Sequence, residues 1–146
     1  MAVLTFYDKY KESLIDSTYT PVNFSSDTIK IGLCTSSYTP GASDTMWSTP
    51  ASFEVSGTNY SAGGATTTAT VTGTGTATIT VKLSNITWSQ SVSGFSNALT
   101  MVLYKSTGTS STSPLIAYYN FGSAVGNVSG DLTITFDGTL GAFTLS

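Results

Sequence analysis

The sequence predicts a single all-β domain, an antiparallel β-sandwich or jelly-roll-like fold with a short N-terminal helix. Residues 69–83 alternate small or apolar residues with mostly threonines, which is the two-residue period of a strand. Serine and threonine make up about a third of the 146 residues, and Thr, Tyr, Val and Ile between glycines are typical of strands and turns. We expect an N-terminal helix and arm at 1–22 and a β-sandwich domain at 23–146.

The N-terminal segment predicts one short helix, over residues 6–16. Thr5, followed three residues later by Asp8, resembles a capping box, and Phe6 and Tyr10 follow at helical spacing. A helix of this length is not stable alone in water. Its aromatic stripe must therefore be covered, by the β-domain itself in the favoured interpretation or by another subunit.

The first clear strand is predicted at 28–34 and is followed by a polar loop that carries Tyr38 and Trp47. Two interpretations of these aromatic residues are open. They contact a partner, or Trp47 folds back as a lid over one end of the core. Another short strand is predicted to begin at Phe53. Tyr60, between two glycine-containing turns, is expected to be buried with its hydroxyl bonded to the backbone.

The alternating segment would span about 50 Å as one strand, so it is expected to fold back as a hairpin. Cross-strand partners must point to the same face, which predicts a three-residue loop at 73–75. This register places Val71 opposite Ala77 and Thr70 opposite Thr78. The hairpin then has one apolar face and one face of hydroxyl groups, and it projects from the domain or lies at its edge.

The later strands are predicted from the same parity argument. Apolar residues occupy odd-numbered positions up to Leu83 and even-numbered positions at Ile86 and Trp88. A bulge is therefore expected at 84–85. Residues 95–104 are apolar on both parities, which predicts a central strand covered on both faces, with 115–121 as its partner. A strand at 132–136 is expected to pair with the end of the chain through a two-residue turn at 138–139.

Charge and composition argue against several function classes. The five lysines are scattered, arginine is absent and the formal net charge is −3, so no basic face for nucleic acid is expected. No apolar run approaches the roughly 20 residues that cross a bilayer, and no targeting segment is visible. Histidine is absent, which excludes a Ser-His or Cys-His nucleophile. Cys34 is expected to be a small buried hydrophobe rather than a reactive thiol.

The acidic residues are dispersed, and no catalytic residue, metal or cofactor is expected. Asp131 and Asp137 flank one predicted strand and could share a calcium ion, although a role in turns explains them at least as well. Glycosylation sequons occur about as often as such a hydroxyl-rich composition produces by chance. They lie at Asn23, Asn59, Asn85 and Asn127.

Several stretches together carry a resemblance to a known family. The most specific is Glu-Val-Ser-Gly-x-x-Tyr-x-x-Gly-Gly at 54–64. The other stretches, which with it span nearly all of the chain after the predicted helix, are 26–40, 86–89, 101–104, 114–122 and 131–138. Their order and spacing resemble a family of small all-β bacteriophage virion structural proteins, which are similar to capsid decoration or cement proteins.

The resemblance implies a virion component without enzymatic activity, a capsid decoration protein that binds the outer surface of the major capsid shell and stabilises it. The major capsid protein is then the partner, and a homo-oligomer is expected, with a trimer suiting three-fold capsid positions. The alternative is a head-fibre or tail-associated receptor or glycan-binding module, in which Tyr60 and Trp88 would join the loop aromatics in stacking on sugars. The candidate partner-contact residues are Phe6, Tyr10, Tyr38, Trp47, Thr70 and Thr78.

Overall fold

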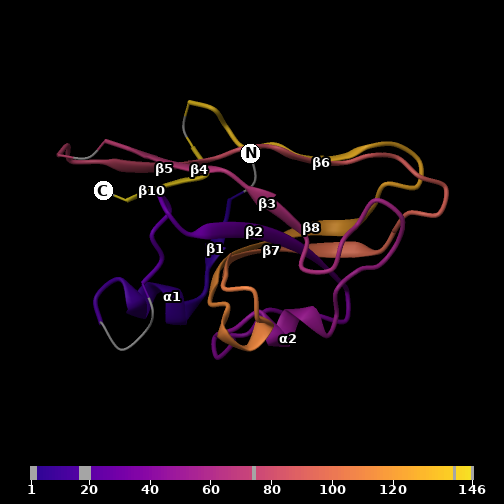
Figure 1. Ribbon diagram of the computed structural model, residues 1–146, viewed down its shortest axis with the longest axis horizontal. Coiled ribbons are helices and arrows are strands. Elements are labelled where there is room, and N and C mark those ends of the chain that lie inside the picture. The colour runs from indigo at the N-terminus through magenta and orange to yellow at the C-terminus, as the bar shows by residue number, and fades with distance from the viewer. Residues whose placement is uncertain (1–2, 17–20, 74, 140, 146) are drawn as a thin grey trace.

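The computed structural model describes residues 3–16, 21–73, 75–139 and 141–145, and it shows an all-β domain of antiparallel sheets (Figure 1). Strands form 41% of the chain and helices 9%, which confirms the predicted all-β class. Of the helices in these described segments, none is both long and apolar enough to cross a membrane.

A five-stranded sheet with the order β1-β8-β7-β2-β3 forms the centre of the domain. Its strands, in that order, are β1 (Thr5–Phe6), β8 (Leu115–Val125), β7 (Ala98–Ser106), β2 (Thr28–Thr35) and β3 (Ala65–Thr67).

Two small sheets, β10-β5-β4 and β6-β9, lie over one face of this central sheet (Figure 1). They consist of β4 (Ala69–Thr72), β5 (Ile79–Leu83), β6 (Ile86–Trp88), β9 (Leu132–Ile134) and β10 (Phe143–Leu145). Three short helices complete the described elements: α1 (Asp8–Ser13), α2 (Ser48–Ala51) and the 3-10 helix η1 (Ser110–Thr112). The helix α2 lies on the side of the central sheet away from the small sheets.

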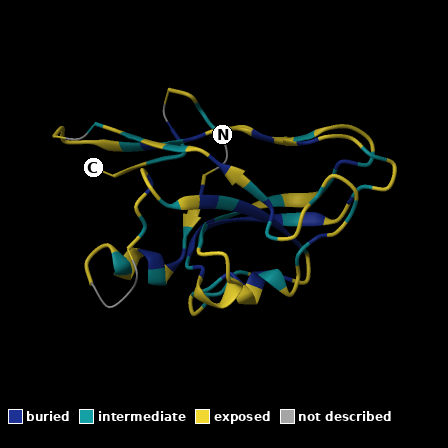
Figure 2. Cartoon of the chain, viewed as in Figure 1, coloured by how far each residue is buried: buried dark blue, intermediate teal, exposed yellow. Residues whose placement is uncertain are grey.

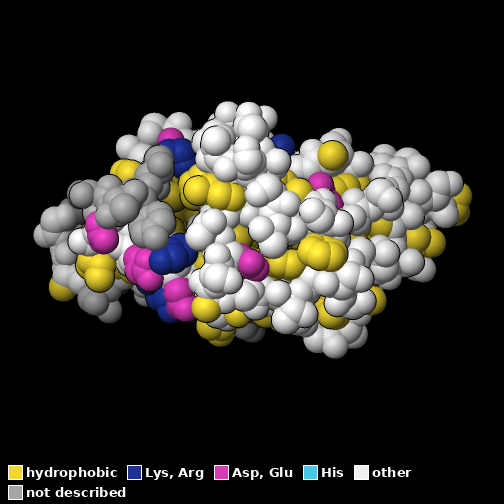
Figure 3. Space-filling model, turned by 90° about the horizontal axis from the view of Figure 1, so that it is seen from below, with side chains coloured by type: hydrophobic (Ala, Val, Ile, Leu, Met, Phe, Trp, Pro, Cys, Tyr) yellow, Lys and Arg dark blue, Asp and Glu magenta, His cyan; other side chains and the backbone are white. Residues whose placement is uncertain are grey.

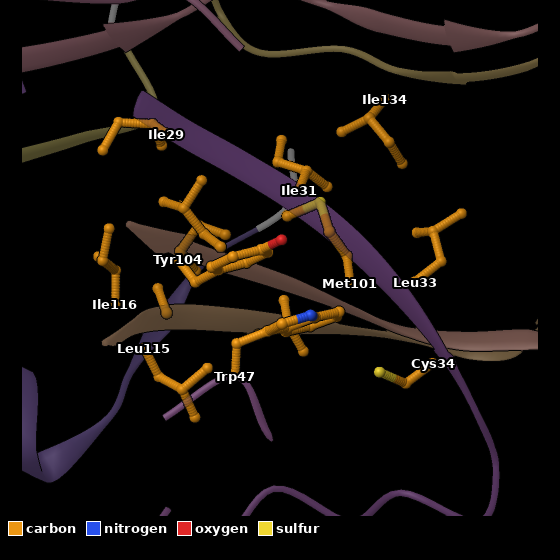
Figure 4. Packing of buried hydrophobic residues seen from close by; sticks show 14 of the residues in the cluster. Ile29, Ile31, Leu33, Cys34, Trp47, Met101, Tyr104, Leu115, Ile116 and Ile134 are labelled. Atoms are coloured by element: carbon orange, nitrogen blue, oxygen red, sulfur yellow. The ribbon is translucent and has the colours of Figure 1, made fainter. Parts of the chain in front are cut away.

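The central strands β2 and β7 are buried on both faces over most of their length, as Figure 2 shows by their mainly dark colour. This confirms the prediction of a central strand covered on both sides. In Figure 4, Ile31 and Ile134 lie on the side of the small sheets, whereas Trp47 and Leu115 lie on the other. The core therefore has two halves that share one sheet.

Trp47 folds back under the central sheet, so the lid interpretation is the one that holds. Its side chain is 4% exposed, and its ring stacks on Tyr104 with centroids 4.4 Å apart and an interplanar angle of 3°. Gly32 makes this possible because a Cβ atom at that position would overlap the indole ring. Gly32, which has no side chain, thus allows the Trp47 ring to lie directly against β2 and cover it.

The N-terminal helix is shorter than predicted, and its predicted capping box is wrong. Thr5 and Phe6 form β1, which pairs with β8, and α1 begins only at Asp8. Tyr7 precedes the helix, and no side chain caps its first turn. The Tyr7 N–H donates to the carbonyl of Ile116 at 3.1 Å, so the central sheet already satisfies the backbone where the extra helical turn was expected.

The hairpin β4–β5 forms, but its predicted register is wrong. Val71 lies opposite Val81 instead of Ala77, and Thr70 lies opposite Lys82 instead of Thr78. Both registers keep the apolar residues on one face, so parity could not distinguish them. The observed one places Val81, which is 3% exposed, in the core and leaves a longer loop. The middle residue of the predicted loop, Thr74, lies outside the described residues.

The predicted C-terminal hairpin is also wrong, because the two strands belong to different sheets. Ile134 of β9 lies opposite Ile86, and Phe143 of β10 lies opposite Val81. A turn closed by the Gly141 N–H, which donates to the Asp137 carbonyl at 2.9 Å, carries the chain from one small sheet to the other.

Two smaller expectations changed in detail. Instead of a bulge at 84–85, the chain passes there from β5 to β6, and Leu83 and Ile86 on either side are both buried. The strand predicted to begin at Phe53 is reduced to a single bridge between Cys34 and Glu54.

A fully buried asparagine, Asn127, joins the loops at one end of the domain. The Phe95 N–H donates to its Oδ1 at 2.9 Å, and its Nδ2 donates to the carbonyls of Thr58 at 3.2 Å and Ser89 at 2.8 Å. Gly94 leaves room for this amide, since a Cβ there would overlap Asn127 Oδ1. The Asn127 side chain therefore links three backbone segments by hydrogen bonds in the interior of the domain.

Replacing Asn127 by Ala should lower the free energy of unfolding by about 2–4 kcal/mol, because one buried N–H and two carbonyls lose their partner. Urea denaturation measures this loss. Asn120→Ala is the matched control, since Asn120 is exposed and its Oδ1 accepts one local bond from the Gly122 N–H. Equal losses for the two variants would contradict the role assigned to Asn127.

Candidate partner-contact surface

Three of the six predicted contact residues are buried and are not available to a partner. Tyr38, Trp47 and Tyr10 are 3%, 4% and 5% exposed, so their selection as surface contacts is wrong. Phe6 is half-buried, and its ring packs on Tyr10 and on Phe143 with centroids 5.5 and 4.9 Å apart. The aromatic residues of the helix are thus covered by the chain's own domain, in agreement with the favoured interpretation.

Tyr38 serves a hydrogen-bond chain below the central sheet. Its hydroxyl lies 2.7 Å from that of Tyr7 and donates to Asp44 Oδ2 at 2.9 Å. The same carboxylate oxygen accepts the Gly41 N–H at 2.9 Å. Burial raises the pKa of both phenols above the ordinary value, and the negative charge of Asp44 acts in the same direction. This arrangement fixes the 38–44 loop and engages the hydroxyls of Tyr7 and Tyr38 inside the protein.

The aromatic residues considered for sugar stacking are also occupied. Trp88 is 4% exposed, and its ring stacks on Tyr60 at 5.9 Å and meets Phe95 edge-on at 6.4 Å. Tyr60 is half-buried rather than buried, but its hydroxyl does accept the Leu33 N–H at 2.9 Å, as predicted. Sugar stacking needs an aromatic ring with a free face. The rings of Tyr60, Trp88 and Trp47 instead pack on other aromatic rings inside the protein.

Glu54 is the half-buried carboxylate that holds the glycine-containing turn after it. Its Oε1 accepts the Tyr60 hydroxyl at 2.6 Å and the Gly63 N–H at 2.7 Å. Burial raises the pKa of Glu54, although these two donors and the nearby Lys30 act in the opposite direction. The Tyr104 hydroxyl donates to the Gly63 carbonyl at 2.7 Å, which joins this turn to the Trp47 stack.

The carboxylates and the cysteine that the sequence analysis considers have local roles in the structure. No group of three or more Cys, Asp or Glu side chains among the described residues could hold a metal ion. Asp131 Oδ1 accepts the Gln90 N–H at 2.8 Å, and Asp137 Oδ1 accepts the Thr139 N–H at 2.7 Å, as expected of carboxylates that order turns. Cys34 is fully buried, and burial raises the pKa of its thiol to about 12. It is the small buried hydrophobe that the sequence predicts.

The exposed part of the predicted site is a threonine face on the β10-β5-β4 sheet. Thr80 lies opposite Thr72 on one side and Thr144 on the other, so three threonines form a row across the sheet. Thr70 is exposed on the same strand as Thr72, and Thr78 is exposed in the loop before β5. The predicted hydroxyl face is therefore present, with different cross-strand partners.

A second hydroxyl pair and a lysine extend this face. On the neighbouring small sheet, the hydroxyls of Thr87 and Thr133 lie 2.9 Å apart. The ammonium of Lys82 donates to the Gly138 carbonyl at 2.8 Å. The sequence does not reveal the contribution of β10, because the parity argument pairs this strand with 132–136 whereas the structure pairs it with β5.

The opposite side of the molecule has a different character. Figure 3, seen from the side that carries α2, shows charged side chains mainly at one end. There α1 carries two ion pairs, between Lys9 and Glu12 and between Lys11 and Asp8. Exposed ion pairs of this kind contribute little stability.

Glu54→Gln should remove a pH dependence from the stability of the protein. A raised carboxyl pKa stabilises the fold below the unfolded-state pKa, about 4.3, and this stabilisation is lost as the pH rises through the folded-state pKa. Relative to the Gln variant, the wild-type protein should therefore lose free energy of unfolding as the pH rises above about 4.3. Denaturant titrations at a series of pH values measure the difference.

Tyr60→Phe is the companion variant, because it removes the hydroxyl and keeps the carboxylate. It should retain the pH dependence, since the Glu54 carboxylate loses one of the donors that stabilise its charge. Parallel stability curves for the wild-type protein and Glu54→Gln would show that Glu54 titrates as it does in the unfolded chain.

Comparison of the chain with protein-family models, with curated proteins and with solved structures finds no match. The surfaces and contacts described above are therefore the structural basis for a functional proposal. Among the described residues, the threonine face is a largely exposed feature that lies outside the core.

Proposed function

We propose that this chain is a non-enzymatic structural protein of a bacteriophage particle, a decoration protein that binds the outer surface of the capsid shell. The observation that carries the proposal is the threonine row Thr72, Thr80 and Thr144, on a sheet at the periphery of the domain, in which Thr72 and Thr144 are exposed and Thr80 is half-buried. The sequence resemblance described above supplies the class of particle. The major capsid protein is the proposed partner.

A threonine face suits permanent attachment to a protein shell. Hydroxyl groups donate and accept hydrogen bonds, and the methyl groups beside them bury apolar area without a charge to desolvate. A contact made in this way changes little with ionic strength, because few of its interactions are screened by salt. The low charge of the chain, 9% of residues, fits this mode of binding.

The receptor or glycan-binding alternative has less support. Its aromatic residues Tyr38, Trp47 and Trp88 are buried, and the ring of Tyr60 packs on Trp88 and Phe95. Sugar recognition by stacking would need other aromatic residues. The particle proposal uses a threonine row whose outer members, Thr72 and Thr144, are exposed.

Addition of the purified protein to undecorated capsids tests the proposal. We expect saturable binding at symmetric positions, and binding about tenfold weaker for Thr80→Lys, which places a long charged side chain in the middle of the threonine row. Ser111→Lys is the control and should bind normally, because Ser111 is exposed on η1, which packs beside α2 away from the small sheets.

No binding of the wild-type protein to capsids, together with binding to host cells or glycans, would overturn the proposal. Equal loss of binding by both lysine variants would show that the threonine row is not the contact. Circular dichroism of each variant confirms that the fold is retained before binding is compared.

A further inference from the structure

We propose that the outer edge of β4 is a self-association site, at which the β4 strands of two copies pair antiparallel about a two-fold axis at Thr70. This inference concerns contacts between copies of the chain and holds whether or not the protein binds a capsid. It replaces the three-fold assembly expected from the sequence resemblance with a two-fold one, because antiparallel pairing of identical edges is isologous.

The backbone of β4 has unpaired groups on the side away from β5. The Ser84 N–H donates to the Thr68 carbonyl at 2.9 Å, which continues the β4–β5 pairing and shows that even-numbered residues of β4 face β5. The N–H and C=O groups of Ala69 and Val71 therefore point outward. In the segments that the structure describes, no strand lies along this edge.

Other edges are shorter or interrupted. The strand β1 has two residues, and β8 continues past it with an irregular register in which Gly122 has a φ of 78°. The Gly122 N–H is already bonded to Asn120 Oδ1 at 2.7 Å. By contrast, β4 pairs with β5 without a bulge and contains neither a charge nor a proline. It lacks the features by which proteins usually block an edge strand.

The sequence of this edge is self-complementary. Residues 68–72 read Thr-Ala-Thr-Val-Thr, so antiparallel pairing centred on Thr70 places Thr68 against Thr72 and Ala69 against Val71. Threonines then meet threonines on the outer face, and apolar side chains meet on the inner face. Each Ala69–Val71 pair exchanges two backbone hydrogen bonds, because the groups of both residues point outward.

Electrostatics does not oppose the pairing. The nearest charged side chain on this sheet is Lys82, opposite Thr70 on β5. Three strand spacings separate it from its copy, about 14 Å, which exceeds the Debye length of about 8 Å in physiological salt. The interface is short, which places it in the weak, transient class in free solution.

Cysteine cross-linking tests the register directly. In the proposed pair, Thr70 faces its own copy at a non-hydrogen-bonded position with Cα atoms about 4.5 Å apart, within the range that a disulfide bridges. Thr70→Cys should therefore give a disulfide-linked dimer under mild oxidation. Thr72→Cys is the matched control on the same face and strand. Its copies lie about 14 Å apart, so it should remain monomeric.

Mixing Thr68→Cys with Thr72→Cys should give a mixed dimer, because these two positions face each other in the proposed register. The native Cys34 can remain in all variants, since it is fully buried. Cross-linking of Thr72→Cys to the same extent as Thr70→Cys, or of neither, would overturn the proposal.

Sedimentation at high protein concentration supplies a second readout without cross-linking. Thr70→Lys places two ammonium groups opposite each other at the axis and should weaken dimerisation about tenfold or more. Thr144→Lys, on the opposite edge of the same sheet, should leave it unchanged. The reverse result would place the contact at β10 and refute the proposal.

Discussion

The rest of the structure depends on the need to cover the strands β2 and β7 on both faces. The strand β7 carries apolar side chains on both faces, and β2 is buried on both faces over most of its length, so neither face can be left to water without a large loss of hydrophobic stabilisation. The small sheets cover one face. Trp47, α2 and the loop before them cover the other, which is possible only because Gly32 lets the indole ring lie against the strand. The long polar loop that carries Trp47 thus helps to cover the core.

The sequence predicts where the strands lie better than it predicts which strands pair with each other. Alternation identified β2, β5 and the two-sided strand β7, because burial imposes a period on the chain itself. Register depends on energies between segments, and the β4–β5 pairing shifted by four residues without changing either face. The position of Trp47 depends on its close contact with Gly32, which has no side chain. This contact joins two separate elements, so no local sequence pattern predicts it.

Polar residues have two separate roles in this molecule. A few buried or half-buried ones, among them Asn127, Glu54 and Tyr60, bond to backbone groups and hold loops in fixed positions. The many exposed threonines are left free to face outward on the small sheets. Composition indicated the abundance of hydroxyl groups, but only the topology showed that β10 adds Thr144 to the row formed with Thr72 and Thr80.

Both tryptophans are buried, one in each half of the core, so the fluorescence of each tryptophan reports on its own half. Trp47 lies under the central sheet beside Tyr104, whereas Trp88 lies in the small β6-β9 sheet against Tyr60 and Phe95. A variant that retains only one tryptophan would report the solvation of one layer through its emission wavelength. Coincidence of the two unfolding curves is the criterion for a single cooperative transition, and their separation would reveal that one layer can detach while the shared sheet persists.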